Sequence, residues 1–405
     1  MKPAAAGGRA ELILLYAARA ARGFGDGFAV IVLPAYLSEV GFGPFQIGLV
    51  AAVALLGSAV VTLAVGLVAA GRDLRSLLLI GALTMAATGF LLPNVAHILL
   101  ILTVMFIGTM NPSTGDIGML VPLEQTMLAC DVADQDRTRT FAHYSLIGSI
   151  ATAAGALAAA APDWLVTSGA SRLGALTSMF YVYAALGLVC AALYFCLPRI
   201  ESHWQRSETK PLGPSRGIVY KLAALFSLDS FAGGFAVPSL VALWLFERFD
   251  LSLATASLFF FWSNVLTAAS YPIAARLARR FGLINTMVFT HIPSSVCLIL
   301  AALSPNLALV LALLLVRSAL SQMDVPTRTS YVMAVVTPVE RTAAASVTAV
   351  PRSLASSLSP ALAGAMLATP FAGLPLVICG VLKIAYDLSL LFMFRHTKPP
   401  EEQRI

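Results

Sequence analysis

Long apolar stretches alternate with short polar ones along the whole chain. Most apolar stretches reach the length of about 20 residues that a helix needs to cross the hydrocarbon core of a bilayer. This pattern predicts an all-α membrane protein with twelve transmembrane helices. The expected spans are 11–38, 45–70, 75–93, 97–128, 140–161, 174–197, 218–247, 251–275, 284–303, 306–336, 342–367 and 371–394.

The expected spans fall into two sets of six that repeat parts of each other. The sequence Gly-Phe-Ala-Val at 27–30 recurs at 234–237, and the same offset places Arg72-Asp73 opposite Arg279-Arg280. Ordered matches at a constant offset indicate a duplicated six-helix unit, and paired repeats are a common transporter design. The predicted domains are an N-terminal six-helix bundle at 1–197, a cytoplasmic linker at 198–217 and a C-terminal six-helix bundle at 218–405.

Composition agrees with a membrane protein. Of the 405 residues, 59% are hydrophobic and 11% are charged, whereas soluble domains carry about 25% charged residues. Most of the surface is therefore expected to contact the lipid bilayer. The net charge of +6 comes from short basic clusters between apolar stretches, and because they form no single patch, no nucleic-acid partner is expected.

Lysine and arginine concentrate in alternate loops and in the linker. The loops between them carry little basic charge beyond Arg172 and Arg248. Because loops rich in Lys and Arg stay in the cytoplasm, both termini and the linker are predicted to be cytoplasmic. The chain is expected to be a multi-pass monomer in a bacterial inner membrane.

Cysteine usage and short motifs argue against a metal or cofactor. The five cysteines are scattered in or at the ends of apolar segments, and no CxxC or CxxxH pattern occurs. A disulfide framework or metal site is therefore not expected. The chain also lacks HExxH and P-loop motifs and a nucleotide-binding domain, so neither a cofactor nor ATP-driven transport is expected.

A loop motif adds a family resemblance to the six-plus-six layout. After the eighth span the chain reads Ala-Arg-Leu-Ala-Arg-Arg-Phe-Gly at 275–282. This is similar to the Gly-x-Leu-Ala-Asp-Arg-x-Gly loop of the major facilitator superfamily, with Arg279 in place of the usual Asp. The counterpart at 71–75, Gly-Arg-Asp-Leu-Arg, is more degenerate. Over nearly its whole length the chain resembles this superfamily.

The resemblance implies a secondary transporter with two bundles around a central cavity. Access to the cavity would alternate as one bundle rocks against the other. The resemblance also implies a cytoplasmic gate whose contacts exist only when that side is closed. The gate residues would be Arg72, Asp73, Arg75, Arg276, Arg279 and Arg280.

Charged residues inside the first half are candidates for the transport site. An ionisable group in a span costs roughly 3 kcal/mol on insertion scales and so tends to face a cavity or a partner. Arg19, Arg22 and Asp26 have the spacing of one helix face. Asp26 could carry a proton or contact substrate, or Arg22 and Asp26 could neutralise each other within the helix.

The fourth expected span contains a second candidate region. Asn111, Pro112 and Gly115 interrupt it next to Asp116, and irregular backbone at membrane depth is tolerated where it is buried or lines a cavity. The interruption could mark a binding site or a kink needed only for packing. Glu124, further along the same span, is expected at the membrane interface.

The tenth span is the repeat-mate of the fourth. Asp324 falls close to the position that matches Asp116, and Arg317 and Gln322 lie on the same span. Two symmetry-related carboxylates near mid-membrane favour a cavity between the halves. Arg328 could line the same cavity or pair with Glu340 at a cytoplasmic gate.

Other charges lie in spans seven, eleven and twelve. Arg352 is a candidate anion ligand, because a guanidinium binds carboxylate or phosphate through two hydrogen bonds, or it could pair internally with Asp229 or Asp324. Lys383 and Asp387 have the spacing of a helical pair and are expected to be structural. In the eighth span, aromatic residues and Asn264 could contact a solute or serve packing alone.

An enzyme is the alternative from another class. The sequence Gly-x-Gly-Asp at 23–26 and Tyr-Asp at 386–387 match the two signatures of intramembrane aspartyl proteases, in which two aspartates activate water. In that family the Tyr-Asp helix comes just before the Gly-x-Gly-Asp helix, whereas here the order is reversed across a duplicated chain. A protease would need both Asp26 and Asp387.

Within transport, two main hypotheses remain open, and a facilitator without ion coupling is a third possibility. Arg317 and Arg352 favour a proton-coupled carrier of a small organic or anionic solute, with Asp26 or Asp324 moving the proton. A multidrug–proton antiporter would instead use these aspartates with aromatic side chains. The fifth span lacks the Gly-Pro step typical of drug antiporters, although the eleventh has a similar sequence at 359–364.

Overall fold

A computed structural model of the chain describes residues 7–68, 72–113, 118–131, 134–199, 213–337 and 340–395. The described part is helical and contains no β-strand, as the sequence predicts. The first half comprises α1 (Gly7–Glu39), α2 (Pro44–Val68), α3 (Leu74–Leu91), η1 (Leu92–Asn94), α4 (Ile98–Ile107), α5 (Leu120–Asp131), α6 (Asp134–Ala158), α7 (Ala161–Thr167) and α8 (Arg172–Phe195). The second half comprises α9 (Arg216–Gly234), α10 (Pro238–Phe249), α11 (Leu253–Phe281), α12 (Leu283–Leu303), α13 (Leu307–Ser321), α14 (Asp324–Val335), α15 (Arg341–Leu367) and α16 (Leu374–Phe394).

Hydropathy separates two kinds of expected span. Eight helical stretches of the described chain are long and apolar enough to cross a membrane, and they correspond to the second, third, fifth to ninth and twelfth expected spans. The other four correspond to α1, α4 with α5, α13 with α14, and α15. These elements are broken or carry charged and polar residues along their length, as expected of helices that face protein or a polar cavity instead of lipid.

Three of the expected spans are each built from two helices. The predicted interruption of the fourth span separates α4 from α5, and the tenth breaks between α13 and α14. The break between α9 and α10 was not predicted. It arises at Pro238, which lacks a backbone N–H and forces the preceding Val237 into an extended conformation. At the equivalent place α1 has Ile31 and continues as a helix.

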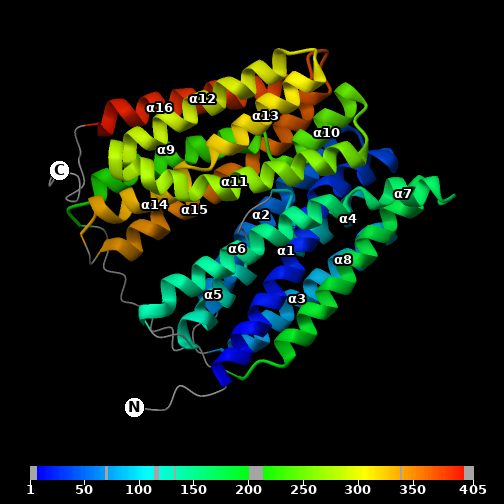
Figure 1. Ribbon diagram of the computed structural model, residues 1–405, viewed down its shortest axis with the longest axis horizontal. Coiled ribbons are helices and arrows are strands. Elements are labelled where there is room, and N and C mark those ends of the chain that lie inside the picture. Colours follow the sequence, from blue (N-terminus) through cyan, green and yellow to red (C-terminus); the bar gives the residue numbers. More distant parts are fainter. Residues whose placement is uncertain are drawn as a thin grey trace.

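The two halves form a V-shaped arrangement (Figure 1). They converge at the end that carries α7 and α10, and diverge toward the end where α1 begins and α16 ends. The apolar core follows this shape. One cluster spans both halves, with Phe28 and Leu37 of α1 in the same cluster as Leu240 and Trp244 of α10. At the diverging end each half has its own separate cluster.

Small residues allow the helices to approach closely. A Cβ atom on Gly27 of α1 would collide with the backbone at Thr152 of α6, and one on Gly155 would collide with the backbone at Phe24. Between the halves, Gly48 of α2 and Gly364 of α15 pack backbone against backbone. Close approach through small residues is how membrane helices gain packing without a hydrophobic driving force.

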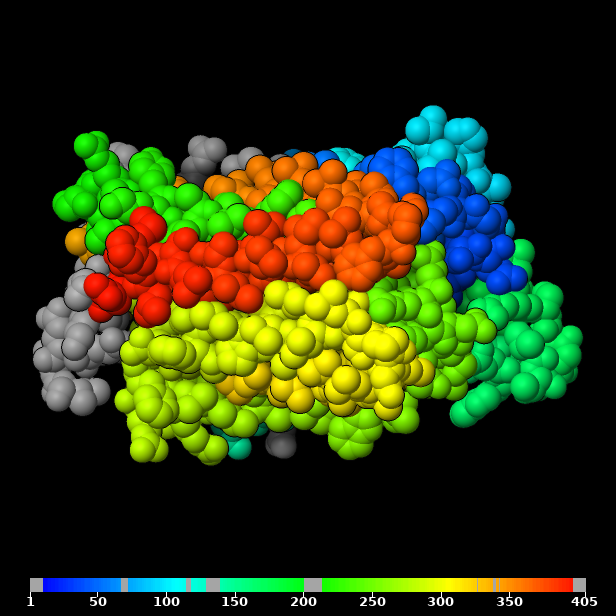
Figure 2. Space-filling model, turned by 90° about the horizontal axis from the view of Figure 1, so that it is seen from above, coloured from blue at the N-terminus to red at the C-terminus, as the bar shows by residue number. Residues whose placement is uncertain are grey.

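The outer surface of the second half is apolar. Figure 2 shows α16 running along this face, with residues of the first half visible at the end where the halves converge. α16 packs between α9 and α12 and leaves Phe392 77% exposed, and Phe289 of α12 is 65% exposed. Large apolar side chains exposed in this way along helices indicate contact with lipid.

Candidate functional site

The interior charge of the first half centres on one carboxylate, Glu124 of α5. Its side chain is fully buried and forms an ion pair with Arg22 of α1. The hydroxyls of Tyr144 on α6 and Tyr194 on α8 both donate hydrogen bonds to it, and Arg22 Nη2 also donates to Tyr144 Oη at 3.3 Å. Four helices thus hold one buried negative charge, which one cation and two neutral donors satisfy.

Asp26 lies one helical turn from Arg22 on α1. It accepts a hydrogen bond from the Tyr183 hydroxyl of α8 at 3.4 Å between oxygen atoms. Asp26 and Arg22 both line a small cavity of about 20 Å³, together with Ser58 of α2 and Thr109 beyond the end of α4. A cavity of this size has room for a water molecule between polar groups. Asp26 is half-buried, so a proton could reach its carboxylate.

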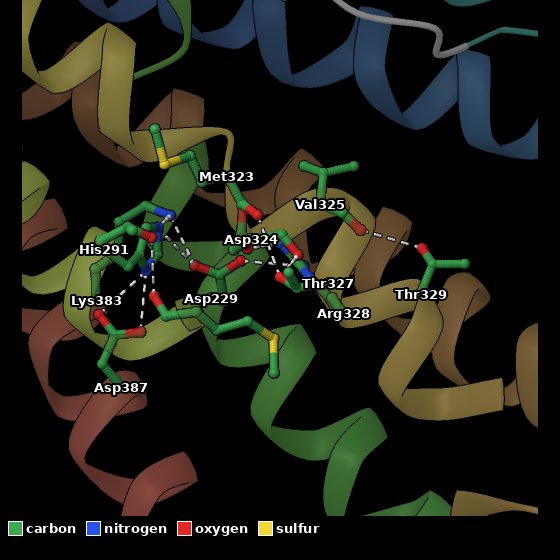
Figure 3. A network of polar contacts seen from close by, with 12 residues as sticks. Asp229, His291, Met323, Asp324, Val325, Thr327, Arg328, Thr329, Lys383 and Asp387 are labelled. Carbon is green, nitrogen blue, oxygen red and sulfur yellow. Dashed lines mark hydrogen bonds and ion pairs between the residues drawn. The ribbon is translucent and has the colours of Figure 1, made fainter. Parts of the chain in front are cut away.

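The interior charges of the second half form a larger network, shown in Figure 3. Asp229 of α9 is its centre. Asp229 Oδ1 accepts a hydrogen bond from Lys383 Nζ of α16 at 2.7 Å, and Oδ2 lies 3.2 Å from Arg328 Nη1 of α14. Arg328 also forms an ion pair with Asp324, one turn earlier on α14. Each of the two cations therefore has more than one partner.

His291 of α12 joins this network to a third carboxylate. Its Nδ1 lies 3.0 Å from Asp387 Oδ1, and its Nε2 lies 3.3 Å from Lys383 Nζ. An ammonium group can only donate hydrogen bonds, so Nε2 must accept and Nδ1 must carry the proton that bonds to Asp387. Both ring nitrogens of His291 are therefore engaged in the network.

Two arginines of the second half remain outside the network. Arg352 lies near the middle of α15, which packs between α2 and α9. Its side chain is exposed, although the charges of Arg328, Asp229 and Asp324 act on it. Arg317 of α13 lines a cavity with Asn264 of α11. Neither guanidinium forms an ion pair or hydrogen bond with the described residues.

Comparison with known proteins decides the family. The family profile described as Major Facilitator Superfamily matches residues 15–228 and again 222–405. The chain belongs to the major facilitator superfamily. Its family is one of membrane transporters, and the two matches fall on the two halves of the sequence repeat.

Individual relatives of this superfamily member are distant. An uncharacterized membrane protein of Saccharomyces cerevisiae, YJR124C, is 24% identical over 421 residues, covering 95% of this chain and 94% of the relative. The solved structure of the nucleoside transporter NupG has a TM-score of 0.75 at 15% identity, covering 95% of this chain and 99% of that one. A D-xylose–proton symporter has a TM-score of 0.74 at 16% identity, covering 96% and 98%.

The structure brings several predicted residues of the superfamily member together. Asp324 and Asp229 share Arg328, so Arg328 does not pair with Glu340. Asn111 is buried at the break after α4, where its side-chain oxygen accepts hydrogen bonds from the Ser113 backbone and hydroxyl. Gln322 directly follows α13 and is half-buried. Asp116 lies outside the described residues.

The charged groups have partners in the structure that the sequence did not indicate. Glu124 is fully buried, and two tyrosines and Arg22 contact its carboxylate. Arg22 turns toward Glu124, although the charge of Asp26 also acts on it. Lys383 and Asp387 do not pair with each other as a structural helical pair, since Lys383 binds Asp229 and Asp387 binds His291. Helical spacing shows which residues can meet but not which competing partner is nearer.

The two aspartates of the protease alternative lie in different halves. Asp26 accepts a hydrogen bond from Tyr183, whereas Asp387 contacts His291. The first glycine of the Gly-x-Gly-Asp match packs against Gly148 of α6. This sequence therefore serves helix packing, and no shared-proton aspartate pair is formed.

The predicted gate residues lie at the diverging end. Asp73 accepts hydrogen bonds from the Arg75 backbone and the Ser76 hydroxyl, and so caps α3. The Arg75 guanidinium lies 4.7 Å from the ring centre of Phe195. Arg72 and the three arginines at the end of α11, Arg276, Arg279 and Arg280, are exposed. A gate between these two regions stays a prediction about the state in which this end is closed.

Sequence reasoning missed His291, Tyr144 and Tyr194. Each is a polar side chain inside an apolar stretch, and each contacts a buried carboxylate from another helix. A signal for His291 was available, because a histidine in the middle of an apolar span is rare unless it has a partner. The tyrosines carried no such signal, since aromatic residues fill membrane helices for packing alone.

Proposed function

We propose that this transporter carries a small organic anion and couples its movement to protons. The observation that carries the proposal is a pair of arginines, Arg317 and Arg352, that have no partner among the described residues. They add two cations to Arg328 and Lys383, which are already paired with the carboxylates of the network. A charge at membrane depth without a counter-ion is costly, so an anion that travels through the protein would complete the site.

Arg352 is placed to meet that anion. An exposed arginine in the middle of a membrane helix would be costly against lipid. α15 is in contact with α2 of the other half and with α9, and the charges of Asp229 and Asp324 reach Arg352. Both facts support a side chain that faces the space between the halves. A guanidinium there can bind a carboxylate with two parallel hydrogen bonds.

Asp26 is the better of the two predicted proton carriers. Asp324 is already bound to Arg328 and would have to break that ion pair before taking a proton. Asp26 lines a cavity and has a neutral tyrosine as its hydrogen-bond donor. With both termini in the cytoplasm, the diverging end would open to the cytoplasm, and rocking of the halves would expose Asp26 to the other side.

A transport assay tests this function. Purified protein in liposomes should take up radiolabelled small carboxylates faster when a proton gradient is imposed. Arg352→Ala should reduce uptake by at least tenfold, and Asp26→Asn should make the remaining exchange insensitive to the gradient. Arg172→Ala is the matched control, because Arg172 pairs with Glu39 at the surface, 3.2 Å away. Uptake that both Arg352→Ala and Arg317→Ala leave unchanged would refute the anion proposal.

The alternative of multidrug export has less support. It required the arginines to be neutralised internally, and neither Arg317 nor Arg352 is paired with a described residue. The sequence at 359–364, which is similar to a drug-antiporter step, has a packing role, because Gly364 approaches the backbone of Pro44 and Gly48. Multidrug export would become the better proposal if the protein transported lipophilic cations and this transport depended on Asp26 but not on the arginines.

A further inference from the structure

A second small cavity lies where the break between α9 and α10 meets α11 and α13. It measures about 40 Å³, which is room for a few water molecules or one small polar group. Its polar lining comes from Arg317, Asn264, Ser263 and Ser318. The apolar lining includes Phe259, Phe260, Leu314 and Val241, and no aspartate or glutamate lines the cavity.

Arg317 differs from the other interior arginines. Arg22 and Arg328 each contact a carboxylate, whereas no carboxylate of the described residues contacts Arg317, and none contributes to its electrostatic surroundings. A guanidinium offers five N–H donors, and here none of them has an acceptor within the described chain. An unpaired guanidinium at membrane depth needs an anion or water to be stable.

Asn264 adds a further donor to the cavity. Its Nδ2 is buried and has no hydrogen-bond partner among the described residues. The two serine hydroxyls contact each other at 2.7 Å, and Ser318 Oγ also lies 2.9 Å from the Leu314 carbonyl oxygen. The donors of the cavity without a partner in the described chain are therefore the N–H groups of Arg317 and Asn264.

The break between α9 and α10 adds positive charge at the cavity. α10 begins at Pro238, and both Pro238 and Val241 of its first turn line the cavity. The N-terminus of a helix carries a partial positive charge that favours an anion. Positive charge, free donors and a helix N-terminus thus coincide at one cavity without a carboxylate.

We infer that Arg317 and Asn264 form a carboxylate-binding subsite. One carboxylate group of the substrate would occupy the cavity and accept hydrogen bonds from both side chains, and only the part of its apolar body next to that group would lie against Phe259, Phe260 and Leu314. This inference rests on the proposed anion transport and names the substrate class more closely, as a carboxylate attached to a small apolar or aromatic group. The first turn of α10 also donates from Ser239 N to the Pro112 carbonyl of the other half, at 3.2 Å, so occupancy of the subsite would act on a contact between the halves.

A binding experiment tests the subsite without transport. Purified wild-type protein in detergent is melted with benzoate, with butyrate and with benzamide, the neutral analogue of benzoate. A ligand that binds the folded state raises the melting temperature. Benzoate should raise it, with butyrate weaker and benzamide without effect. Arg317→Gln should abolish the benzoate shift, and the surface control Arg172→Gln should retain it.

A second variant, Asn264→Asp, distinguishes a loss of ligand binding from a loss of folding. This substitution places a carboxylate in the cavity beside Arg317 and so supplies internally the anion that the ligand would bring. It should raise the melting temperature of the ligand-free protein and remove the benzoate shift. In the double variant with Arg317→Gln the stabilisation should disappear.

The outcomes separate the subsite from the wider function. The subsite is overturned if benzoate gives no shift in the wild type, if Arg317→Gln keeps the full shift, or if Asn264→Asp destabilises the protein as much as Asn264→Leu. An Arg317-dependent shift in a protein that does not transport carboxylates would sink the proposed function and keep the subsite. If Arg317→Gln transported carboxylates with the KM of the wild type, the proposed function would stand and the subsite would be overturned.

Discussion

The two halves match the profile of the same family, yet they bury charge in different ways. In the first half, Glu124 has one cation, Arg22, and two tyrosine donors. In the second half, Asp229, Asp324 and Asp387 share Arg328, Lys383 and His291 through an unbroken series of contacts (Figure 3). The contacts of the first half thus balance one carboxylate with one cation, whereas those of the second half share three carboxylates among several basic groups.

This difference predicts different roles for the two clusters. Among the described residues, Glu124 forms an ion pair with Arg22, and the charge of Asp26 also acts on Arg22. Because the carboxylate also accepts hydrogen bonds from tyrosines of two further helices, the cluster is suited to holding four helices together. In the network of the second half each cation keeps a partner if one contact breaks. Such a network can rearrange at low cost when the halves rock or when an anion approaches Arg352.

Removing Glu124 should have the largest effect on stability. In Glu124→Ala the guanidinium of Arg22 stays buried without its counter-ion, and breaking a buried pair in this way costs about 3–5 kcal/mol. We expect a large fall in the melting temperature of the purified protein. The melting temperature of Glu124→Gln should lie between those of Glu124→Ala and the wild type, because the amide oxygen can still accept a hydrogen bond from a tyrosine. A Glu124→Ala protein as stable as the wild type would contradict a structural role for the cluster.

Removing Asp229 should cost less, although it is the centre of the larger network. In Asp229→Asn, Lys383 keeps His291 and Arg328 keeps Asp324, so neither cation is left without a polar partner. We expect a loss of about 1–3 kcal/mol, the usual range for one contact within a network. Adding Lys383→Met to Asp229→Asn should restore part of the lost stability.

A double-mutant cycle on Asp229 and Lys383 measures this coupling directly. The melting temperatures of the two single variants and the double variant give the part of the effect that belongs to the pair. If Asp229→Asn proved as damaging as Glu124→Ala, the network would be as rigid as the cluster of the first half, and the contrast between the halves would fail.

The sequence predicted the architecture because the relevant signals are local. Length and apolar composition identify a membrane helix wherever it lies in the chain. The interruption at Asn111-Pro112 predicted the break after α4. Pro238 offered the same kind of signal and was overlooked, because the apolar run continues on both sides of it. The number of twelve crossings is still a prediction, since four of the expected spans are too polar or too broken to qualify by hydropathy.

The partners of the charged residues could not be predicted in the same way. Spacing along α1 suggested Arg22 with Asp26, but the fold places Glu124 of α5 closer to Arg22. Lys383 and Asp387 are one turn apart on α16, yet Asp229 and His291, from two other helices, bind them. Pairing inside a bundle depends on which helices are neighbours, and that information is not present within a single span. For the same reason, the cavity that unites Arg317 with Asn264 became visible only in three dimensions.

Glu340 extends the comparison to a carboxylate that no cation of the described residues contacts. It precedes α15 at the diverging end and accepts hydrogen bonds from the Ser215 hydroxyl at 2.6 Å, the Thr337 hydroxyl at 2.6 Å and the Gly213 backbone. These bonds favour the ionised form. The Ser215 hydroxyl first, and then that of Thr337, lower the pKa of Glu340 to about 2. The contacts tie the start of α9 to the start of α15.

Its loss should produce the smallest effect of the three, with a defined pH dependence. Because the folded-state pKa lies below the unfolded value of about 4.3, the ionised contacts stabilise the protein fully above that value, and the contribution disappears as the pH falls toward 2. The melting temperature of Glu340→Gln should therefore lie slightly below that of the wild type by a constant amount between pH 5 and 8, with the two curves approaching each other in acid. Ser215→Ala should reproduce part of the deficit, whereas Ser389→Ala, which removes a hydroxyl from the exposed face of α16, should not. A deficit that grows between pH 5 and 8 would mean that another titrating group, and not Glu340, responds to pH at this end of the molecule.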